Sequence, residues 1–366
     1  MTEVDDFESI REIWCQILPL NIFGDEIFLS VDWLSNWWKH FGGKRKKLLL
    51  TLEEEGKIVG IAPLMLSRYK MSAFGSIRKI EFMGTRQSDY SNFILNRNEK
   101  DAIKSIIDYL EEHEDWDWIE LKEIQENETY ATQPFSSLSS GLDFKERVCN
   151  LCPYVTLPEN FEVLKKSFSR NFRQNLNRYS KKLFRDHKVE FKRFDEAGFS
   201  VKEAMNQFIM LHQTKWHADG LPGAFADDTF REFHMDFAQA AARNRWLALS
   251  FLMVDGEPAA AQYNFDYNNK MYYYLGGFLP RYAEYSIGNL MIMFMLEDSI
   301  KKGLKEYDMT RGDEPYKLRW TNKYRRNFEV RLVHKKMASE LYNWVTWGKT
   351  VESIAIKLGL SLKQTA

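Results

Sequence analysis

The stretch YYYLGGFLPRYAEYSIGNLMIMFMLEDSIKKGLKEYDMTRG, residues 272–312, decides the fold. It predicts an aromatic strand, a polar turn, an almost wholly apolar helix over 289–302 and a short strand over 305–312. A helix that links two strands in this way predicts a crossover connection, and the two strands then lie parallel in a sheet. Because the strands before it form hairpins, we expect a mixed sheet.

The same order of elements occurs twice in the chain. Hairpins are predicted at 47–66, around Glu55-Gly56, and at 245–265, around Asp255-Gly256. Each hairpin leads to a third strand, a helix and a last strand, which are 77–84, 99–113 and 115–124 in the first half and 271–278, 289–302 and 305–312 in the second. We therefore predict an α/β fold with two domains, residues 1–152 and 153–335, and a helical tail over 336–366.

The composition agrees with two well-packed domains and excludes several classes of protein. A chain of 366 residues is too long for one typical core. Its 51 Lys+Arg and 52 Asp+Glu give a net charge of −1, so no global field recruits nucleic acid or membrane. Three cysteines are too few for a disulfide framework, and Cys149 and Cys152 lack the second pair of ligands that a zinc site needs. We expect no bound metal.

Nothing in the chain predicts a targeting or membrane-spanning segment. The N-terminal residues MTEVDDFESI are acidic and contain no apolar signal core. The longest apolar run, Leu290 to Leu296, is far shorter than the roughly 20 residues that cross a bilayer. We therefore expect a cytoplasmic enzyme or binding protein.

The turn between the strand and the apolar helix has two explanations. In the first, Ser286 caps the helix and Gly288 allows close packing against the sheet. In the second, an anion binds here, because free N–H groups and the helix dipole favour phosphate at a helix N-terminus. The residues by themselves leave both explanations open.

Three stretches resemble the CelD/BcsL-type acetyltransferases of the GNAT superfamily, which are built from two GNAT-like halves like the Fem peptidyl transferases. These stretches are FMGTRQSDYSNFIL (82–95), FIMLHQTKWHADGLPGAF (208–225) and the block that begins YYYLGGF and ends YDMTRGDEPYKLRW (272–320). The resemblance implies two tandem GNAT-like domains. The first would be degenerate and on the acceptor side, and the second would bind acyl-coenzyme A.

The resemblance also implies an activity. An acyl group, with acetyl as the expected one, would pass from acyl-coenzyme A to an amine or hydroxyl of a small molecule or glycan precursor. Family members are often associated with polysaccharide biosynthesis, so a saccharide acceptor is the first expectation. The pyrophosphate of the coenzyme would lie on the turn formed by Tyr285, Ser286, Ile287, Gly288 and Asn289.

Two other functions stay open. The usual GNAT signature, Arg or Gln followed by x-x-Gly-x-Gly/Ala, is absent, because Arg281 and Gly288 are too far apart to form it. Fem-type relatives with the same double fold use aminoacyl-tRNA as donor. A Fem-like aminoacyl-tRNA-dependent transferase and a non-catalytic binding protein are therefore the alternatives.

The segment RGDEPYKLRW, 311–320, is the candidate catalytic loop. It follows the last core strand, where an open α/β sheet presents its ligand crevice. Arg311 and Lys317 offer positive charge to a phosphate or an oxyanion, and Glu314 can take a proton from an attacking amine. By resemblance, Lys317 occupies the place of a Fem-type active-site lysine. The alternative is a surface turn whose charges pair with one another.

Two further groups of residues are candidates for the site. His212 is a second candidate base, and Lys215 and Trp216 on the same predicted helix are candidates for substrate binding; a half-buried packing role is the alternative. Asp89 and Tyr90 follow a strand in the first half and either bind the acceptor or form an ordinary turn. No cysteine stands in a motif for a covalent acyl-enzyme, so we expect direct transfer.

Residues 164–193 form a strongly basic segment, with 11 Lys/Arg and 2 Asp/Glu. Its apolar residues form one helical stripe, which consists of Leu164, Phe168, Phe172, Leu176, Tyr179 and Leu183. In a neutral chain this predicts an anionic partner that contacts Arg173 and Arg178: coenzyme phosphates, a sugar nucleotide, a tRNA stem or, as a peripheral contact, anionic lipid. A solvated helix face is the alternative. Nothing in the sequence predicts the oligomeric state.

Overall fold

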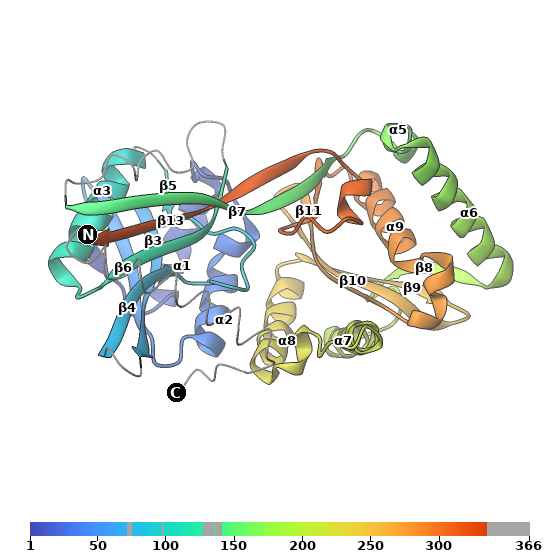
Figure 1. Ribbon diagram of the computed structural model, residues 1–366, viewed down its shortest axis with the longest axis horizontal. Helices are drawn as coiled ribbons and strands as arrows, with labels where there is room; N and C mark the ends of the chain where they lie inside the picture. Colours follow the sequence, from blue (N-terminus) through green and yellow to red (C-terminus); the bar gives the residue numbers. More distant parts are fainter. Residues whose placement is uncertain (72–74, 97–98, 127–134, 136–140, 335–366) are drawn as a thin grey trace. The chain divides into compact units, whose positions relative to one another are not determined.

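The computed structural model describes the chain except for residues 72–74, 97–98, 127–134, 136–140 and 335–366. The chain forms two compact units (Figure 1). Unit 1 contains residues 1–149 and 327–366, and unit 2 contains residues 150–326. The predicted helical tail lies outside the described residues. Among the residues that are described, no helix is long and apolar enough to cross a membrane.

Unit 1 is built on a mixed sheet with the strand order β1-β2-β3-β4-β6-β13-β7, and β5 pairs with β3. The strands are β1 (Thr2–Glu3), β2 (Lys46–Glu54), β3 (Lys57–Met71), β4 (Gly75–Phe82), β5 (Ile94–Leu95), β6 (Trp118–Gln125), β7 (Leu142–Thr156) and β13 (Tyr324–His334). The predicted turn at Glu55-Gly56 joins β2 to β3, with both residues in the left-handed region. Strands β4 and β6 are parallel, as expected for a crossover.

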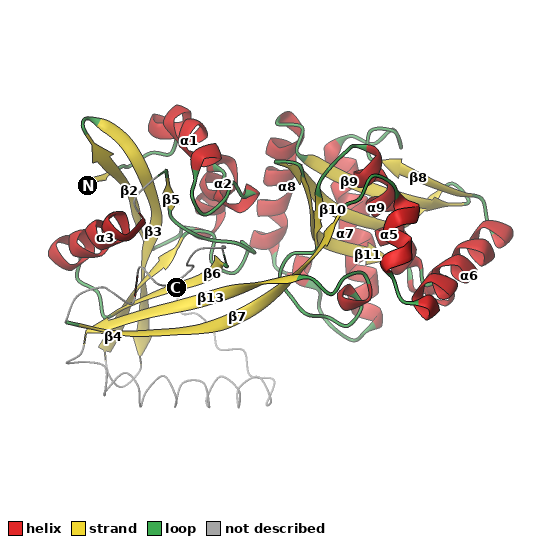
Figure 2. Cartoon of the chain, turned by 90° about the horizontal axis from the view of Figure 1, so that it is seen from above, coloured by secondary structure: helices red, strands yellow, loops and turns green. Residues whose placement is uncertain are grey.

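Helices cover both faces of β2 and β3 in unit 1 (Figure 2). They are η1 (Glu8–Ile10), α1 (Arg11–Ile17), η2 (Leu18–Leu20), η3 (Ile27–Leu29), α2 (Val31–Phe41) and α3 (Glu99–His113). On one side, α3 packs Ile103, Ile106 and Leu110 into a core with alternate residues of β6 and β13, such as Leu121 and Val330. The intervening residues of these strands point to the opposite face, where they carry charge.

Unit 2 repeats this design with the strand order β7-β12-β11-β10-β9-β8. Its strands are β8 (Val189–Arg193), β9 (Leu247–Val254), β10 (Glu257–Tyr267), β11 (Lys270–Phe278) and β12 (Glu306–Asp308). Strands β11 and β12 pair in parallel from Lys270/Glu306 to Tyr272/Asp308. The helix between them is α9 (Ile287–Lys301), so the crossover predicted from residues 272–312 is confirmed.

The helices of unit 2 lie in two layers around this sheet (Figure 1). They are α5 (Phe161–Ser167), α6 (Arg170–Asp186), α7 (Val201–Ala218), η4 (Ala224–Ala226), α8 (Asp228–Arg243), η5 (Pro280–Tyr285), α9 and η6 (Lys317–Arg319). Helices α5, α6 and α9 cover one face, and α7 and α8 cover the other. The apolar residues of α9, such as Leu290 and Met295, are buried in the core between α6 and the sheet.

Strands β7 and β13 cross the unit boundary along the chain. The end of β7 pairs antiparallel with β12, and Asn327–Val333 of β13 pairs antiparallel with β6. The predicted second domain ends at residue 335, but the structure places 327–334 in the sheet of unit 1. The hydrophobic pattern of β13 is that of a strand, and it does not specify which strand is its partner.

The basic segment 164–193 is two helices and a strand, not one continuous helix as its stripe suggested. Helix α5 ends at Ser167, and Ser169 caps α6 by accepting a hydrogen bond from the Phe172 N–H at 3.3 Å. Phe168 and Phe172 both pack edge-on against Trp320, with ring centroids 5.3 and 4.9 Å away. The break is thus accompanied by a local serine cap and by packing of both aromatic rings against a tryptophan distant in sequence.

Candidate functional site

Two loops of unit 2 emerge at the same edge of its sheet. Because β11 and β12 are parallel, the loops that follow them leave the sheet in the same direction, on the side where open α/β sheets bind ligands, although β11 continues to Phe278, beyond the last residue paired with β12. Residues 279–289 follow β11, and residues 309–317 follow β12. Beyond the last paired residues, Thr310 takes a positive φ of 55° and its Oγ1 donates to the Tyr273 carbonyl at 2.9 Å. The predicted anion turn and the predicted catalytic loop thus both follow the carboxyl ends of parallel strands.

Lys317 anchors the catalytic loop. Its side chain is buried, and Nζ donates to the Arg311 carbonyl at 2.7 Å and pairs with Glu314 Oε2 at 3.0 Å. The structure therefore joins Arg311, Glu314 and Lys317 through one ammonium group. Gly312 has a φ of 109°, and a Cβ there would lie 2.5 Å from Glu314 Oε2. Charged groups of the loop thus pair with one another, as the surface-turn alternative predicts. The burial of Lys317, however, distinguishes the loop from a solvated surface turn.

Three tyrosines near the catalytic loop were not among the site residues predicted from the sequence. They are Tyr273 on β11, Tyr307 on β12 and Tyr316 in the loop. Burial raises the pKa of all three phenols above the ordinary value, so they stay protonated donors at neutral pH. The Tyr307 hydroxyl donates to Gln262 Oε1 at 2.7 Å, and Tyr273 and Tyr316 are hydrogen-bonded to each other. The only local signal was the position of Tyr316 directly before Lys317.

The turn before α9 combines parts of both explanations. Ser286 adopts the left-handed conformation, φ 53° and ψ 40°, and its side chain makes no capping hydrogen bond. Its Oγ instead accepts from Asn289 Nδ2 at 2.9 Å, so the expected serine cap is absent. A Cβ on Gly288 would lie 3.3 Å from the Phe278 ring, which supports close packing.

The N–H groups of this turn are compatible with an anion. In the described part of the chain, the N–H groups of Ile287 and Gly288 donate no backbone hydrogen bond, whereas those of Asn289 and Leu290 donate to the Ser286 carbonyl. Two donors at the start of a 15-residue helix therefore remain for a ligand or water.

His212 is buried on α7 among aromatic rings. Phe208, Trp216 and Phe225 surround it, and Gln213 Oε1 lies 3.2 Å from its Nδ1. Burial lowers the pKa of His212 to about 4, so the ring is neutral at neutral pH and a weak base. These contacts favour packing over catalysis, and a catalytic role stays a prediction.

Lys215 and Trp216 contact each other and their own helix. Lys215 Nζ pairs with Asp219 Oδ2 at 2.6 Å and lies 4.4 Å from the centroid of the Trp216 ring. These contacts involve α7 and the residue after it, not the loop that holds Lys317. Substrate binding by this pair therefore stays a prediction.

Asp89 and Tyr90 are both buried in unit 1. The Asp89 carbonyl accepts from Asn327 Nδ2 at 2.7 Å, and the same amide donates to Glu123 Oε2 at 2.7 Å. Glu123 sits at an irregularity in the pairing of β6 with β13 and has a φ of 60°. The geometry ties these residues to the strand that returns from unit 2, and acceptor binding by Asp89 and Tyr90 stays a prediction.

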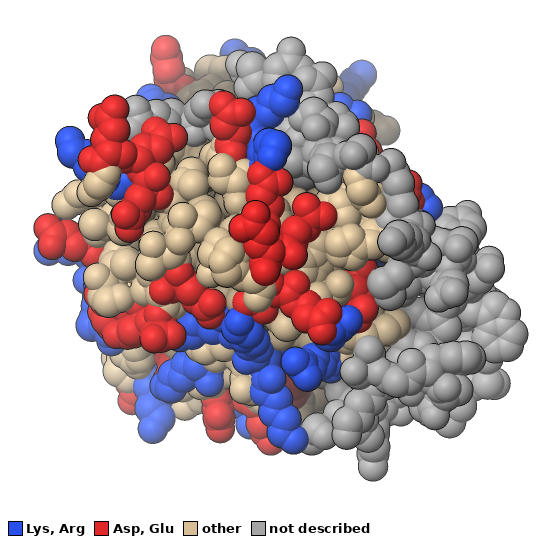
Figure 3. Space-filling view, turned by 90° about the vertical axis from the view of Figure 1, so that its left-hand side faces the viewer, with Lys and Arg blue, Asp and Glu red and all other residues tan. Residues whose placement is uncertain are grey.

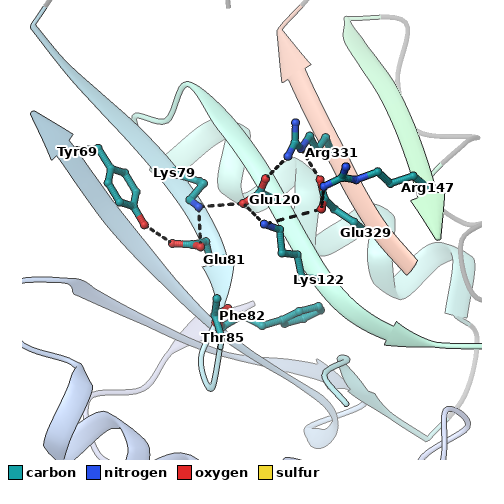
Figure 4. A network of polar contacts seen from close by, with 10 residues as sticks. All are labelled: Tyr69, Lys79, Glu81, Phe82, Thr85, Glu120, Lys122, Arg147, Glu329 and Arg331. Atoms are coloured by element: carbon teal, nitrogen blue, oxygen red, sulfur yellow. Dashed lines mark hydrogen bonds and ion pairs between the residues drawn. The ribbon is translucent and has the colours of Figure 1, made fainter. Parts of the chain in front are cut away.

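A row of paired charges crosses the sheet of unit 1 opposite α3 (Figure 4). Lys79 contacts Glu81 and Glu120 at 2.7 and 2.9 Å. The row continues through Glu120 to Arg331 at 2.7 Å, Arg331 to Glu329 at 2.6 Å, and Glu329 to Arg147 at 2.6 Å. Acids and bases alternate, so the row compensates its own charge.

Glu120 is the centre of this row. Burial opposes its ionisation, but the neighbouring ammonium and guanidinium groups outweigh burial and lower the pKa of Glu120 to about 2. Each acid of the row has a basic partner, which indicates a structural network. The pattern contrasts with the basic segment in unit 2.

Arg173 and Arg178 lie on α6 and differ in their contacts. Arg173 Nη1 donates to the Lys166 carbonyl at 2.9 Å, which ties it to the end of α5. Arg178 is exposed and its guanidinium lies 4.8 Å from the Tyr179 ring centroid. Arg178 is the more exposed of the two, and ligand binding by either arginine stays a prediction.

The family of the second unit follows from comparison with known proteins. Residues 170–318, from the first residue of α6 to just past Lys317, match the family model of an acetyltransferase (GNAT) domain. The matched residues include both loops, the one after β11 and the one after β12. No curated protein matches the chain.

Solved structures resemble the chain across both units. FemX is 13% identical, with a TM-score of 0.64 over 90% of this chain and 97% of FemX. The C-terminal domain (DUF2156) of a putative lysylphosphatidylglycerol synthetase from Agrobacterium fabrum is 11% identical, with a TM-score of 0.50 over 89% of this chain and 92% of that one. L-PGS from Bacillus licheniformis is 11% identical, with a TM-score of 0.50 over 91% and 97%. At these identities the likeness shows a shared fold, and the predicted mixed α/β fold with two GNAT-like halves is confirmed.

Proposed function

We propose that the protein is an acyltransferase that moves an acyl group, acetyl being the first to test, from acyl-coenzyme A to an amine or hydroxyl. The observation that carries this proposal is that two loops with complementary chemistry follow parallel neighbouring strands within the residues that match a GNAT domain. One loop offers backbone donors at a helix N-terminus, and the other holds a carboxylate beside a buried ammonium. Together they supply an anion site and a proton acceptor.

The turn before α9 fits the coenzyme. The N–H groups of Ile287 and Gly288 would receive its pyrophosphate. Bound acyl-coenzyme A would supply a thioester whose carbonyl carbon the acceptor attacks. The protein's own groups then have to remove a proton from the acceptor and stabilise negative charge.

Glu314 is the proposed base. Its side chain is about half exposed, and the ion pair with Lys317 fixes its direction. An acceptor amine must lose a proton to be nucleophilic, and Glu314 Oε1 or Oε2 accepts that proton. Lys317 acts as a positioning residue, because its ammonium is shared between Glu314 and the Arg311 carbonyl.

Two partly buried phenols beside the catalytic loop, those of Tyr273 and Tyr316, supply neutral hydrogen-bond donors. Tyr273 and Tyr316 have raised pKa values because they are buried, so neither ionises at neutral pH. A protonated phenol can donate to an oxyanion or a leaving thiolate without first changing its own charge. This role adds to that of Arg311, whose side chain stays a candidate for charge stabilisation.

A saccharide is the first class of acceptor to test, because the CelD/BcsL-type acetyltransferases that the sequence resembles are associated with polysaccharide synthesis. The similarity to FemX favours a second candidate, an aminoacyl-tRNA-dependent transferase, since the likeness extends over 90% of the chain. The two candidates differ in their donor. Binding of the donor therefore separates them before any acceptor is known.

The first experiment measures donor binding by calorimetry. We expect acetyl-coenzyme A to bind and aminoacyl-tRNA not to bind; the opposite pattern would replace the proposal with the Fem-like alternative. If the protein binds neither donor, the result would favour the remaining alternative, a non-catalytic binding protein.

The second experiment is an acceptor screen that follows thiol release from acetyl-coenzyme A. Cys15 is exposed and Cys149 is partly exposed, so a Cys15→Ser/Cys149→Ser background lowers the protein's own thiol signal. Glu314→Gln is the negative control, because it keeps the size and polarity of the side chain but cannot accept the proton. An acceptor that is turned over equally by Glu314→Gln would exclude Glu314 as the base.

A further inference from the structure

A groove runs along the exposed side of α6, with a volume of about 580 Å³. Its lining consists of Gln174, Asn177, Arg178, Lys181, Lys182 and Arg185. Pockets for small ligands have volumes of about 300–1,000 Å³, and these residues span roughly 16 Å of helix. The groove therefore has the size for a nucleotide, and its walls offer cations and amides only.

The positive charge of this groove is not compensated like the charge of unit 1. The face of unit 1 seen in Figure 3 mixes acidic and basic side chains. On α6, Lys182 pairs with Glu284 and Arg185 with the adjacent Asp186. Within the described residues, Arg178 and Lys181 have no acidic partner. Two exposed cations in one groove leave the lining with a net positive charge that favours an anion.

The groove adjoins the turn that would receive the pyrophosphate. Lys182 Nζ lies 4.7 Å from the centroid of the Tyr285 ring, and the Tyr285 hydroxyl donates to Asp186 Oδ2 at 3.2 Å. The ion pair between Lys182 and Glu284 adds a third link between α6 and η5. Tyr285 directly precedes Ser286, so the basic groove and the anion turn are neighbours.

We propose that this groove binds the 3′-phosphate end of coenzyme A. The inference rests on the proposed function, because the coenzyme carries a diphosphate and, on the adjoining ribose, a phosphate monoester. With the diphosphate at the N–H groups before α9, the monoester would face Arg178 and Lys181. Their cationic groups contact its oxygens by charge-assisted hydrogen bonds, and the amides of Gln174 and Asn177 can bond to the sugar or base.

Dephospho-coenzyme A tests this proposal, because it lacks only the 3′-phosphate. Calorimetry would compare coenzyme A and dephospho-coenzyme A on wild type and on the double variant Arg178→Ala/Lys181→Ala. We expect wild type to bind coenzyme A at least about tenfold more tightly than dephospho-coenzyme A. The groove variant should lose this preference by weakening coenzyme A binding and leaving dephospho-coenzyme A binding within about twofold of wild type.

A matched control removes the same charge from the same basic segment. Lys166 and Arg170 are exposed and do not line the groove. The double variant Lys166→Ala/Arg170→Ala should keep the wild-type preference, and equal losses in both variants would assign the effect to general charge. Melting curves check that both variants fold.

The remaining outcomes separate the subsite from the proposed function. If wild type binds both coenzymes equally, the subsite is refuted and the proposed function stands. If wild type binds neither coenzyme, the subsite and the proposed function are both refuted. If the groove variant keeps its preference for coenzyme A but loses binding to tRNA or to vesicles of anionic lipid, the groove serves a macromolecule and the subsite is refuted.

Discussion

Gly277 of β11 permits the closest approach between the sheet and α7, and replacing it by alanine should destabilise unit 2. A Cβ on this residue would lie 2.4 Å from the His212 backbone nitrogen and 2.6 Å from its Cα. Ordinary contacts begin near 3.4 Å, so α7 and β11 would have to separate by about 1 Å. The obstacle is backbone, which cannot rotate away like a side chain. We therefore expect a cost at the upper end of the usual overpacking range, about 3 kcal/mol.

Urea unfolding followed by circular dichroism measures this cost. At a denaturant slope of about 2.5 kcal/mol per M, a loss of about 3 kcal/mol lowers the midpoint by about 1.2 M. If the two units unfold in separate steps, only the step of unit 2 should move. A midpoint within about 0.3 M of wild type would refute the close contact between α7 and β11.

The neighbouring glycine is the matched control. A Cβ on Gly276 would lie 2.6 Å from the Tyr273 hydroxyl, which is the far end of a side chain. The ring can shift, so Gly276→Ala should cost about 1 kcal/mol or less. Because Tyr273 belongs to the candidate site, this variant should lose acyl transfer more than stability. Equal unfolding midpoints for the two variants would show that the backbone contact at Gly277 has no special cost.

Three further predictions concern single ionisable groups. Lys317→Met should lower kcat by about 100-fold and leave KM for acyl-coenzyme A nearly unchanged, because Glu314 loses its positioning ion pair; wild-type kcat in the folded variant would remove Lys317 from the site. His212 has a pKa of about 4, so His212→Gln should leave the pH dependence of kcat unchanged between about pH 6 and 8; loss of a limb of that profile would identify His212 as a titrating base. Glu120 has a folded pKa of about 2, below its ordinary value, so its contribution to stability is complete above about pH 4.5 and is lost as the pH falls towards 2. Urea unfolding of Glu120→Gln should therefore show about 3 kcal/mol less pH dependence than wild type over that window, and parallel curves would contradict the role of the network.

The sequence by itself determined the elements whose signals are local. The turn dipeptides at Glu55-Gly56 and Asp255-Gly256 specify hairpins, because their residues tolerate positive φ where the turn requires it. The block 272–312 specifies a strand, a helix and a strand, and a helix that links two strands of one sheet favours a parallel crossover. The edge of the sheet that carries the candidate site could therefore be predicted from the chain alone.

The tertiary structure alone decided which residues distant in sequence pack or pair with one another. Phe168, at the break in the basic segment, packs against Trp320, and β13 pairs with β6 of unit 1 although about 200 residues separate them. Burial among rings that come from separate elements lowers the pKa of His212, and no local pattern around this residue could show that shift. The tyrosines around Lys317 come from two strands and a loop. A local pattern records which face of a strand is apolar, but the surroundings of a buried polar group depend on which elements pack together, and that choice is made by the whole fold.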